Sequence, residues 1–250
     1  MESIGIELLA LFVLLGGVAG CVDAIAGGGG LIMVPMLLAS GLPPTAALAT
    51  NKLGSVSGAL AATVHFVRVG QLSLRSAWPL ALLAFGGSVL GCWLLTRIDS
   101  AVLARLIPVL LIAFALYFAF SPQLGQVDSQ RRLSPLSFAV LVPSLIGFYD
   151  GFFGPGTGAF LAMAFVLLAG FNLVKATAHA KLLNFSSNLG ALLFFIGYGS
   201  IHWDIGLALT VGQLLGGTLG ARLAIRGGQR LIRWVMVVMS LAISIKLLGA

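Results

Sequence analysis

Two stretches of this chain, 127 positions apart, carry the same arrangement of residues and decide its architecture. The first reads GCVDAIAGGGG over residues 20–30, and the second reads GFYDGFFGPGTG over residues 147–158. In each stretch an aspartate, Asp23 or Asp150, comes shortly before a cluster of glycines. Glycine and proline interrupt helices, and interrupted backbone at membrane depth is tolerated only inside protein or beside water. The two stretches therefore predict a duplicated helix break.

The duplication extends along most of the chain. Beyond the glycines the separation becomes 129 positions, so that Lys52 matches Lys181 and residues 87–91 match residues 216–220. Residues 87–91 and residues 216–220 each begin and end with glycine. Small residues four positions apart on a helix predict close contact with another helix. The chain therefore divides into a first repeat at residues 1–121, a polar linker at 122–135 and a second repeat at 136–250.

The composition places these repeats in a membrane. Of the 250 residues, 59% are hydrophobic and only 8% are charged, whereas soluble domains are about one quarter charged. The mean hydropathy of +1.09 excludes an ordinary water-soluble domain, so lipid must cover most of the surface. The net charge of +7 comes from basic residues placed singly at the ends of apolar runs, which indicates membrane topology and not nucleic-acid binding. Cys21 and Cys92 lie within apolar runs, which provides neither a disulfide framework nor metal-ligand spacing, and no cofactor is expected.

The charges also predict how the repeats are oriented. Each repeat has five apolar segments, so the second repeat is inverted relative to the first if all five cross the bilayer. Inversion places eight arginines in inside loops and only Arg97 and Arg105 in outside loops. If the short segments do not cross the bilayer, six arginines lie inside and four outside, which is a weaker asymmetry. We therefore predict an all-α polytopic membrane protein of two inverted repeats, each with about five apolar segments and one short or broken helix, with both termini outside and the linker inside. The segments lie at about 5–22, 31–40, 44–66, 76–96, 101–120, 136–151, 157–170, 173–198, 203–224 and 231–248.

Four charged residues fall inside apolar segments: Asp23, Lys52, Asp150 and Lys181. Each costs roughly 2.5–3.5 kcal/mol at the centre of a membrane helix, so each needs a partner or a function. One interpretation pairs the charges within each half, Asp23 with Lys52 and Asp150 with Lys181. The other brings the two lysines together near the repeat axis as an anion site. A short helix that follows an unwound loop favours the second, because its free N–H groups and positive dipole end face the cavity.

The anion-site hypothesis names a set of binding residues. Lysines would neutralise the substrate, backbone N–H groups after each break would hold it, and amides would orient it. Lys181, Asn184 and Asn188 share one helical face, whereas His179 lies off that face and is either a helix–helix hydrogen bonder or a ligand. The two aspartates would pin the loops or carry a coupling proton. The full substrate-binding set is Gly28, Gly29, Gly30, Asn51, Lys52, Gly156, Thr157, Gly158, Lys181, Asn184 and Asn188, with Asp23, Asp150 and His179 as coupling or loop-pinning residues.

Enzyme signatures are mostly absent from the sequence. There is no nucleophile elbow, zinc-protease motif, P-loop or dinucleotide fingerprint. One enzyme class remains as an alternative, because Tyr149-Asp150 is similar to the Tyr-Asp pair of intramembrane aspartyl proteases, whose two carboxylates share a proton. The Gly-x-Gly-Asp partner motif of those proteases is missing, since Asp23 follows Gly20-Cys21-Val22. We therefore expect a protein that is not an enzyme.

A family resemblance rests on the duplicated motifs. The stretch Gly20–Lys52, with its aspartate, its glycine run, Pro35 and Thr50-Asn51-Lys52, resembles the TauE/SafE sulfite exporter family, also called TSUP. Residues 147–155 and 175–184 of the second repeat agree, and the resemblance runs essentially from end to end. It looks closest to a poorly characterised bacterial inner-membrane branch.

The resemblance implies a function. It implies a multi-pass transporter of the bacterial inner membrane that moves small sulfur-containing anions, such as sulfite, thiosulfate or organosulfonates, commonly outward and by alternating access. The glycine runs, Lys52 and Lys181 carry over as the site. Uptake or channel-like conduction is the alternative. The expected partners are a small anionic substrate and the lipid bilayer, with a homodimer as an open option.

Overall fold

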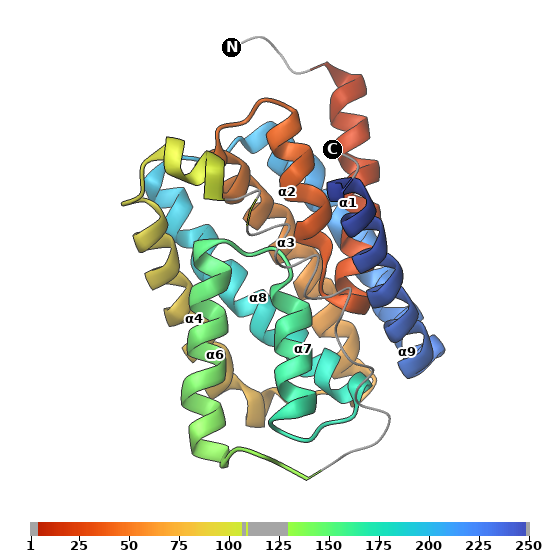
Figure 1. Cartoon of the computed structure of the whole chain (residues 1–250). Helices are drawn as coiled ribbons and strands as arrows, with labels where there is room; N and C mark the ends of the chain where they lie inside the picture. Colours follow the sequence, from red (N-terminus) through yellow and green to blue (C-terminus); the bar gives the residue numbers. More distant parts are fainter. Residues whose placement is uncertain (1–4, 107–108, 110–129, 249–250) are drawn as a thin grey trace.

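The fold is an all-helical bundle (Figure 1). The computed structural model describes residues 5–106, 109 and 130–248, and every element in these ranges is a helix. Five of these helices are long and apolar enough to cross a membrane, which confirms the predicted all-α polytopic class. The helices are α1 (Ile6–Ala26), α2 (Gly29–Ala39), α3 (Pro44–Arg68), α4 (Leu74–Leu95), α6 (Pro135–Phe152), α7 (Thr157–Leu167), α8 (Leu173–Tyr198) and α9 (Trp203–Leu248).

The predicted helix breaks are present in both repeats. Gly27 ends α1 in the left-handed conformation, with φ of 78°, and Gly154 and Gly156 separate α6 from α7 with φ of 98° and 85°. Residues with a Cβ rarely adopt these angles, so glycine allows the chain to reverse here. The short helices that follow, α2 and α7, each have 11 residues. In Figure 1 the α1–α2 hairpin opens towards the end of the molecule that holds the chain termini, and the α6–α7 hairpin opens towards the opposite end.

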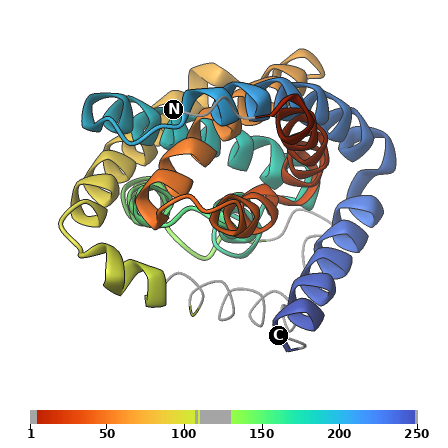
Figure 2. The ribbon, with the colours of Figure 1, turned by 90° about the horizontal axis from the view of Figure 1, so that it is seen from above.

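The two short helices meet end to end in the middle of the bundle. Figure 1 places α2 above α7, and the two overlap when seen from above in Figure 2. A Cβ added at Gly27 would lie 2.1 Å from the backbone nitrogen of Ala159, and one at Gly30 would lie 3.1 Å from Cα of Pro155. The N-terminal ends of α2 and α7 therefore face each other across a very short distance.

Glycines set the helix contacts between the repeats. A Cβ added at Gly87 of α4 would lie 2.3 Å from the carbonyl oxygen of Ser144 in α6. At the matching position, a Cβ on Gly216 of α9 would lie 2.0 Å from the carbonyl oxygen of Gly17 in α1. This confirms the close approach predicted from glycine spacing. The packing of α1 on α9 thus repeats the packing of α6 on α4.

One boundary differs from the sequence prediction, and part of the prediction lies outside the described residues. The first helix continues to Ala26 instead of residue 22, and Gly27 ends it. The ninth and tenth segments are both helical, and a kink at Gly228, whose φ of 56° and ψ of −151° are not helical, separates them within α9. Most of the predicted segment at 101–120 and of the linker at 122–135 lies outside the described residues.

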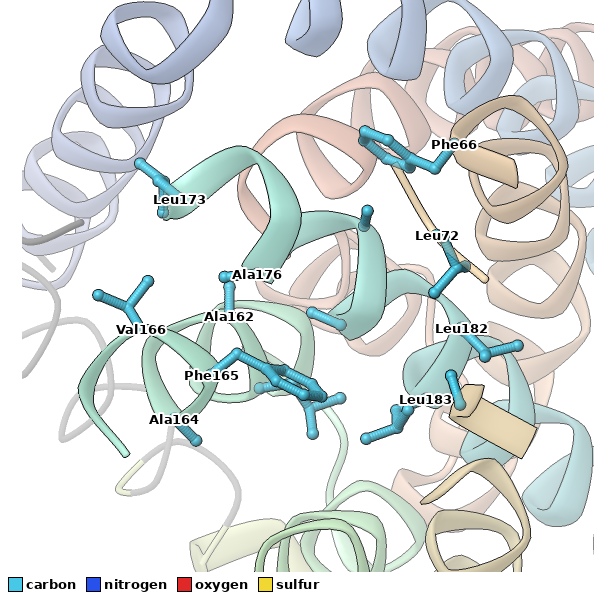
Figure 3. Packing of buried hydrophobic residues seen from close by; sticks show 14 of the residues in the cluster. Phe66, Leu72, Ala162, Ala164, Phe165, Val166, Leu173, Ala176, Leu182 and Leu183 are labelled. Carbon is cyan, nitrogen blue, oxygen red and sulfur yellow. The ribbon is translucent and has the colours of Figure 1, made fainter. Parts of the chain in front are cut away.

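Apolar packing holds the short helices in place. The largest cluster joins α7 and α8 to α3, and Figure 3 shows Phe165 of α7 projecting towards Leu183 of α8, with Phe66 of α3 on the far side of α8. On the outer faces of the bundle, large side chains such as Leu82, Leu145 and Leu215 are exposed. Exposed leucines on long helices are what a lipid-facing surface requires. The protein therefore packs its broken helices inside a shell of membrane-facing helices.

Candidate functional site

The four buried charges form two ion pairs that cross between the repeats. Lys52 on α3 places Nζ 2.8 Å from Oδ1 of Asp150 on α6, and Lys181 on α8 places Nζ 3.0 Å from Oδ2 of Asp23 on α1. The interpretation that pairs charges within each half is therefore wrong. Because the two breaks lie head to head, a lysine at mid-depth reaches the break of the other repeat. Each ion pair consequently links one half of the protein to the other.

Each lysine also binds a backbone carbonyl of its partner. Nζ of Lys52 donates to the carbonyl oxygen of Asp150 at 2.5 Å, and Nζ of Lys181 donates to that of Asp23. These carbonyls belong to the last turns of α6 and α1, and that of Asp23 also accepts from the backbone N–H of Gly27 at 2.7 Å. A cation at a helix C-terminus is stabilised by the dipole as well as by the hydrogen bond. The lysines therefore cap the helices that end at the breaks.

Asp150 has the more complete set of hydrogen bonds. Its Oδ1 accepts from Lys52 and from the Thr157 hydroxyl at 2.9 Å, a proton that Thr157 shares with the carbonyl oxygen of Gly154 at 2.6 Å, and its Oδ2 accepts from the Ser187 hydroxyl at 2.6 Å. Its side chain is only 2% exposed. Burial without these donors would be costly for a carboxylate, and the three partners compensate for it. In the first repeat, the positions of Thr157 and Ser187 are occupied by glycines.

Asp23 is held more loosely. Its Oδ1 accepts from the backbone N–H of Gly29 at 3.2 Å, which ties the side chain to the first turn of α2. Its Oδ2 accepts from Lys181 and, at 3.5 Å, from the amide of Asn184. The Asp23 side chain is 17% exposed. The two carboxylates occupy matching positions in the repeats but differ in burial and in the strength of their contacts.

A small cavity lies between the breaks and the two lysine-bearing helices. Its volume is about 10 Å³, which is enough for about one water molecule. Most of the predicted binding residues line it, whereas Gly28, Gly29 and Lys181 do not. Nζ of Lys181 is nevertheless close to the wall, because it would lie 2.9 Å from a Cβ added at Gly158. The lining residues are Asp23, Gly27, Gly30, Asn51, Lys52, Ser55, Asp150, Gly154, Gly156, Thr157, Gly158, Asn184 and Asn188.

The amides of the cavity differ in how they are satisfied. Asn188 donates to both the backbone and the side-chain oxygen of Asn184, at 2.6 and 2.9 Å. These two residues of the predicted helical face therefore hold each other in position. The side-chain oxygen of Asn51 is buried and has no hydrogen-bond partner in the part of the chain that the structure describes. An amide at the wall of a cavity with no internal partner is available to a ligand or water.

The electrostatic character of the cavity is set by helix ends as well as side chains. The N-terminal ends of α2 and α7 contribute Gly30, Thr157 and Gly158 to the wall. Each helix N-terminus carries a partial charge of roughly +0.5. The C-terminal ends of α1 and α6 lie at the same breaks and carry the opposite partial charge, and the formal charges of the two lysines and two aspartates cancel as pairs. These groups therefore give the cavity no net charge, and the backbone N–H groups at the starts of α2 and α7 are the donors that it offers to a ligand.

His179 lies outside this cavity. Its Nδ1 is 2.8 Å from the carbonyl oxygen of Lys175, one turn earlier on α8. Its ring packs against Phe165 and Phe171, with centroid distances of 5.4 and 5.0 Å. His179 instead lines a second cavity, towards the end of the bundle where α6 begins. The structure therefore separates it from the other residues of the predicted site.

Comparison with known proteins agrees with this architecture. The model of the family described as Sulfite exporter TauE/SafE matches residues 12–247. The chain belongs to the TauE/SafE family. This TauE/SafE protein is 47% identical to a "Probable membrane transporter protein" of Haemophilus influenzae over 98% of its own length and 96% of the relative. It is also 47% identical to "Probable membrane transporter protein YfcA" of Escherichia coli K12, covering 96% and 90% of the two chains, and 23% identical to "Probable membrane transporter protein YunE" of Bacillus subtilis, covering 96% and 95%. No solved structure matches the chain.

Family membership decides between the functional classes. This TauE/SafE protein is a multi-pass membrane transporter and not an enzyme. The geometry agrees, because an aspartyl protease needs two carboxylates that share a proton. Here Asp23 and Asp150 are each bound to a lysine. The prediction that the chain is not an intramembrane protease is confirmed.

Proposed function

We propose that this protein transports small sulfur-containing anions, such as sulfite, thiosulfate or organosulfonates, across the bacterial inner membrane. The observation that carries the proposal is the meeting of two helix N-termini at a buried cavity beside Lys52 and Lys181. N–H groups at a helix start bind oxyanions, and lysines supply the counter-charge. Discontinuous helices at matched places in two repeats mark the substrate site of many transporters.

The cavity volume supports alternating access. At about 10 Å³ the cavity has room for one water molecule and not for a sulfur atom with its oxygens. Substrate entry therefore requires the two repeats to separate locally. The ion pairs Lys52–Asp150 and Lys181–Asp23 both join one repeat to the other, so separation must loosen at least one of them. A substrate oxyanion would then replace the aspartate on the released lysine. A closed cavity of this kind favours a transporter over channel-like conduction.

The membrane orientation follows from the hairpins. The α1–α2 and α6–α7 hairpins open to opposite ends of the bundle, which supports the inverted relation of the repeats (Figure 1). Arginines before α6 and at the end of α3 mark the α6–α7 end as the cytoplasmic one. Under this proposal each hairpin faces one side of the membrane, and rocking of one repeat against the other opens the cavity to each side in turn. Export is the direction that the family name suggests, and uptake is the alternative.

A binding and flux experiment tests the proposal. The purified full-length protein is screened against sulfite, thiosulfate, sulfate, methanesulfonate and acetate, and the best anion is followed into proteoliposomes. We expect sulfur oxyanions to bind and to be transported. Lys52→Met and Lys181→Met should each lower the affinity, whereas Arg97→Gln, which removes an arginine stacked on Trp93, should leave it unchanged. Unchanged affinity in both lysine variants, with reduced thermal stability, would show that the lysines only hold the structure together.

A further inference from the structure

A second, larger cavity lies apart from the central one. It has a volume of about 330 Å³, is open on one side, and is lined by α4, α6, α7, α8 and the segments that join them near the start of α6. This volume falls in the range of roughly 300–1,000 Å³ that is typical of small-molecule sites. The two cavities share no lining residue among those the structure describes. The second cavity is therefore a separate feature of the fold and not an extension of the anion site.

The walls of this cavity combine aromatic rings with a few polar groups. Phe138, Phe165 and Phe171 provide an apolar surface. Arg131 provides a guanidinium, which is charged at all physiological pH values and offers a planar set of donors. The ammonium of Lys175 lies 4.1 Å from the centre of the Phe171 ring and adds positive charge behind the wall. None of the lining residues in the described part of the chain is acidic.

His179 gives the cavity a polar group of defined character. Its Nδ1 contacts a carbonyl oxygen, which can only accept, so Nδ1 carries the proton. In the neutral ring, Nε2 is then the acceptor, and it has no hydrogen-bond partner among the residues that the structure describes. The side chain is 9% exposed and lines the cavity. Nε2 of this buried imidazole is therefore available to a ligand or a water molecule within the cavity.

The imidazole of this cavity is not duplicated in the first repeat. The residue that matches His179 is Thr50, and the hydroxyl of Thr50 accepts a hydrogen bond from the backbone N–H of His202 at 3.1 Å. The polar group that His179 supplies is therefore specific to the second repeat.

We propose that this cavity binds an organic anion with a compact apolar body, such as an aromatic sulfonate or carboxylate. Its charged head would pair with Arg131, its body would pack between the phenylalanine rings, and a donor group or a water molecule would bind Nε2 of His179. The anionic headgroup of a phospholipid offers the same charge chemistry, but it lacks a compact apolar body that fits among the rings. This site is independent of the central anion site, and its ligand need not be transported.

Direct binding to the purified full-length protein tests this proposal, with benzenesulfonate as the probe and sulfite as the comparison. We expect Arg131→Gln to weaken benzenesulfonate binding about tenfold or more and to leave sulfite binding unchanged. His179→Gln should weaken the probe less, and Lys181→Met should leave it unchanged. Because Arg131 is exposed on one side, the affinity of the probe should also fall as salt is added.

Three results would overturn the proposal. The first is that wild-type protein binds no benzenesulfonate. The second is that the probe binds equally well to wild type and Arg131→Gln. The third comes from nanodiscs: if phosphatidylglycerol abolishes probe binding while uncharged lipid does not, the cavity is a lipid headgroup site. If sulfite, thiosulfate and methanesulfonate all fail to bind while the probe binds and depends on Arg131, the proposed transport function is refuted and this inference stands.

Discussion

Asp150→Asn should destabilise the protein more than Asp23→Asn. Both substitutions leave a buried lysine without its counter-charge, and the two lysines are equally buried, with side-chain exposures of 2% and 1%. Breaking one partner out of a fully buried pair costs about 3–5 kcal/mol. The two variants differ in the remaining contacts. Asp150 also loses charge-assisted bonds from Thr157 and Ser187, whereas Asp23 loses one backbone N–H bond and a 3.5 Å amide contact.

The expected difference can be estimated from those bonds. A hydrogen bond to a charged group contributes about 1.5–3 kcal/mol, and a neutral one contributes about 0.5–1.5 kcal/mol. Two hydroxyl bonds at Asp150 weaken from charged to neutral, against one N–H bond at Asp23, so Asp150→Asn should cost about 1–1.5 kcal/mol more than Asp23→Asn. For a chain of this size, 1 kcal/mol corresponds to a Tm change of about 2–4 °C. The two variants should differ by several degrees.

Thermal unfolding in detergent micelles measures this difference. Asp204→Asn, which removes an exposed carboxylate at the start of α9, is the control for loss of negative charge and should change Tm little. The charge-neutral double variant Lys52→Met with Asp150→Asn should recover part of the loss, because no unpaired ion remains buried. The reasoning is refuted if Asp23→Asn is as destabilising as Asp150→Asn, or if the double variant is worse than either single one.

Three further predictions concern the break, the orientation and coupling. Gly27→Ala should prevent folding, because its Cβ would lie 2.1 Å from a backbone nitrogen. Gly41→Ala is the control: it is also at positive φ but has open space around it, so it should cost only about 1–2 kcal/mol. The yield of folded protein in size-exclusion chromatography compares the two variants. A cysteine at Arg131 should react with an impermeant thiol reagent only from the cytoplasmic side, and one at Ile6 only from the periplasmic side, in a background where Cys21 and Cys92 are replaced; the opposite pattern would reverse the orientation. If Asp23 pins the loop, Asp23→Asn, which keeps an acceptor oxygen, should retain partial anion flux with the pH profile of the wild type; loss of the pH dependence would show that Asp23 carries a proton.

Much of the framework could be predicted because it depends on local chemistry. The breaks at Gly27 and Gly154 follow from the backbone freedom of glycine, which is a property of the residue and not of its neighbours. The close contacts at Gly87 and Gly216 follow from the absence of a side chain at a fixed spacing. His179 could also have been placed away from Lys181, because residues two apart on a helix point to nearly opposite sides.

The pairing of the charges could not be predicted in the same way. The sequence places Lys52 and Asp23 in one repeat. No residue near Lys52 in the sequence indicates that α3 directs this lysine towards Asp150 of the other repeat. That choice depends on the end-to-end meeting of α2 and α7, which is a tertiary contact. Ser187 was missed as a partner of Asp150 for a related reason. Serine is common in membrane helices, and only its contact distinguishes a carboxylate ligand from a packing residue.

The two repeats share a framework but differ in their polar contacts. We infer from this difference that the two ion pairs have different roles. Glycine contacts match between the halves, as at Gly87 and Gly216, because a change there would push helices apart. The carboxylates do not match: Asp150 is enclosed by hydroxyl donors, and Asp23 is more exposed and more weakly bound. Each carboxylate has three donors, but those of Asp23 lie at 3.0–3.5 Å and those of Asp150 at 2.6–2.9 Å. If a substrate anion must displace one aspartate from its lysine, we therefore expect the Lys181–Asp23 pair to open first, while the Lys52–Asp150 pair keeps the two halves in register.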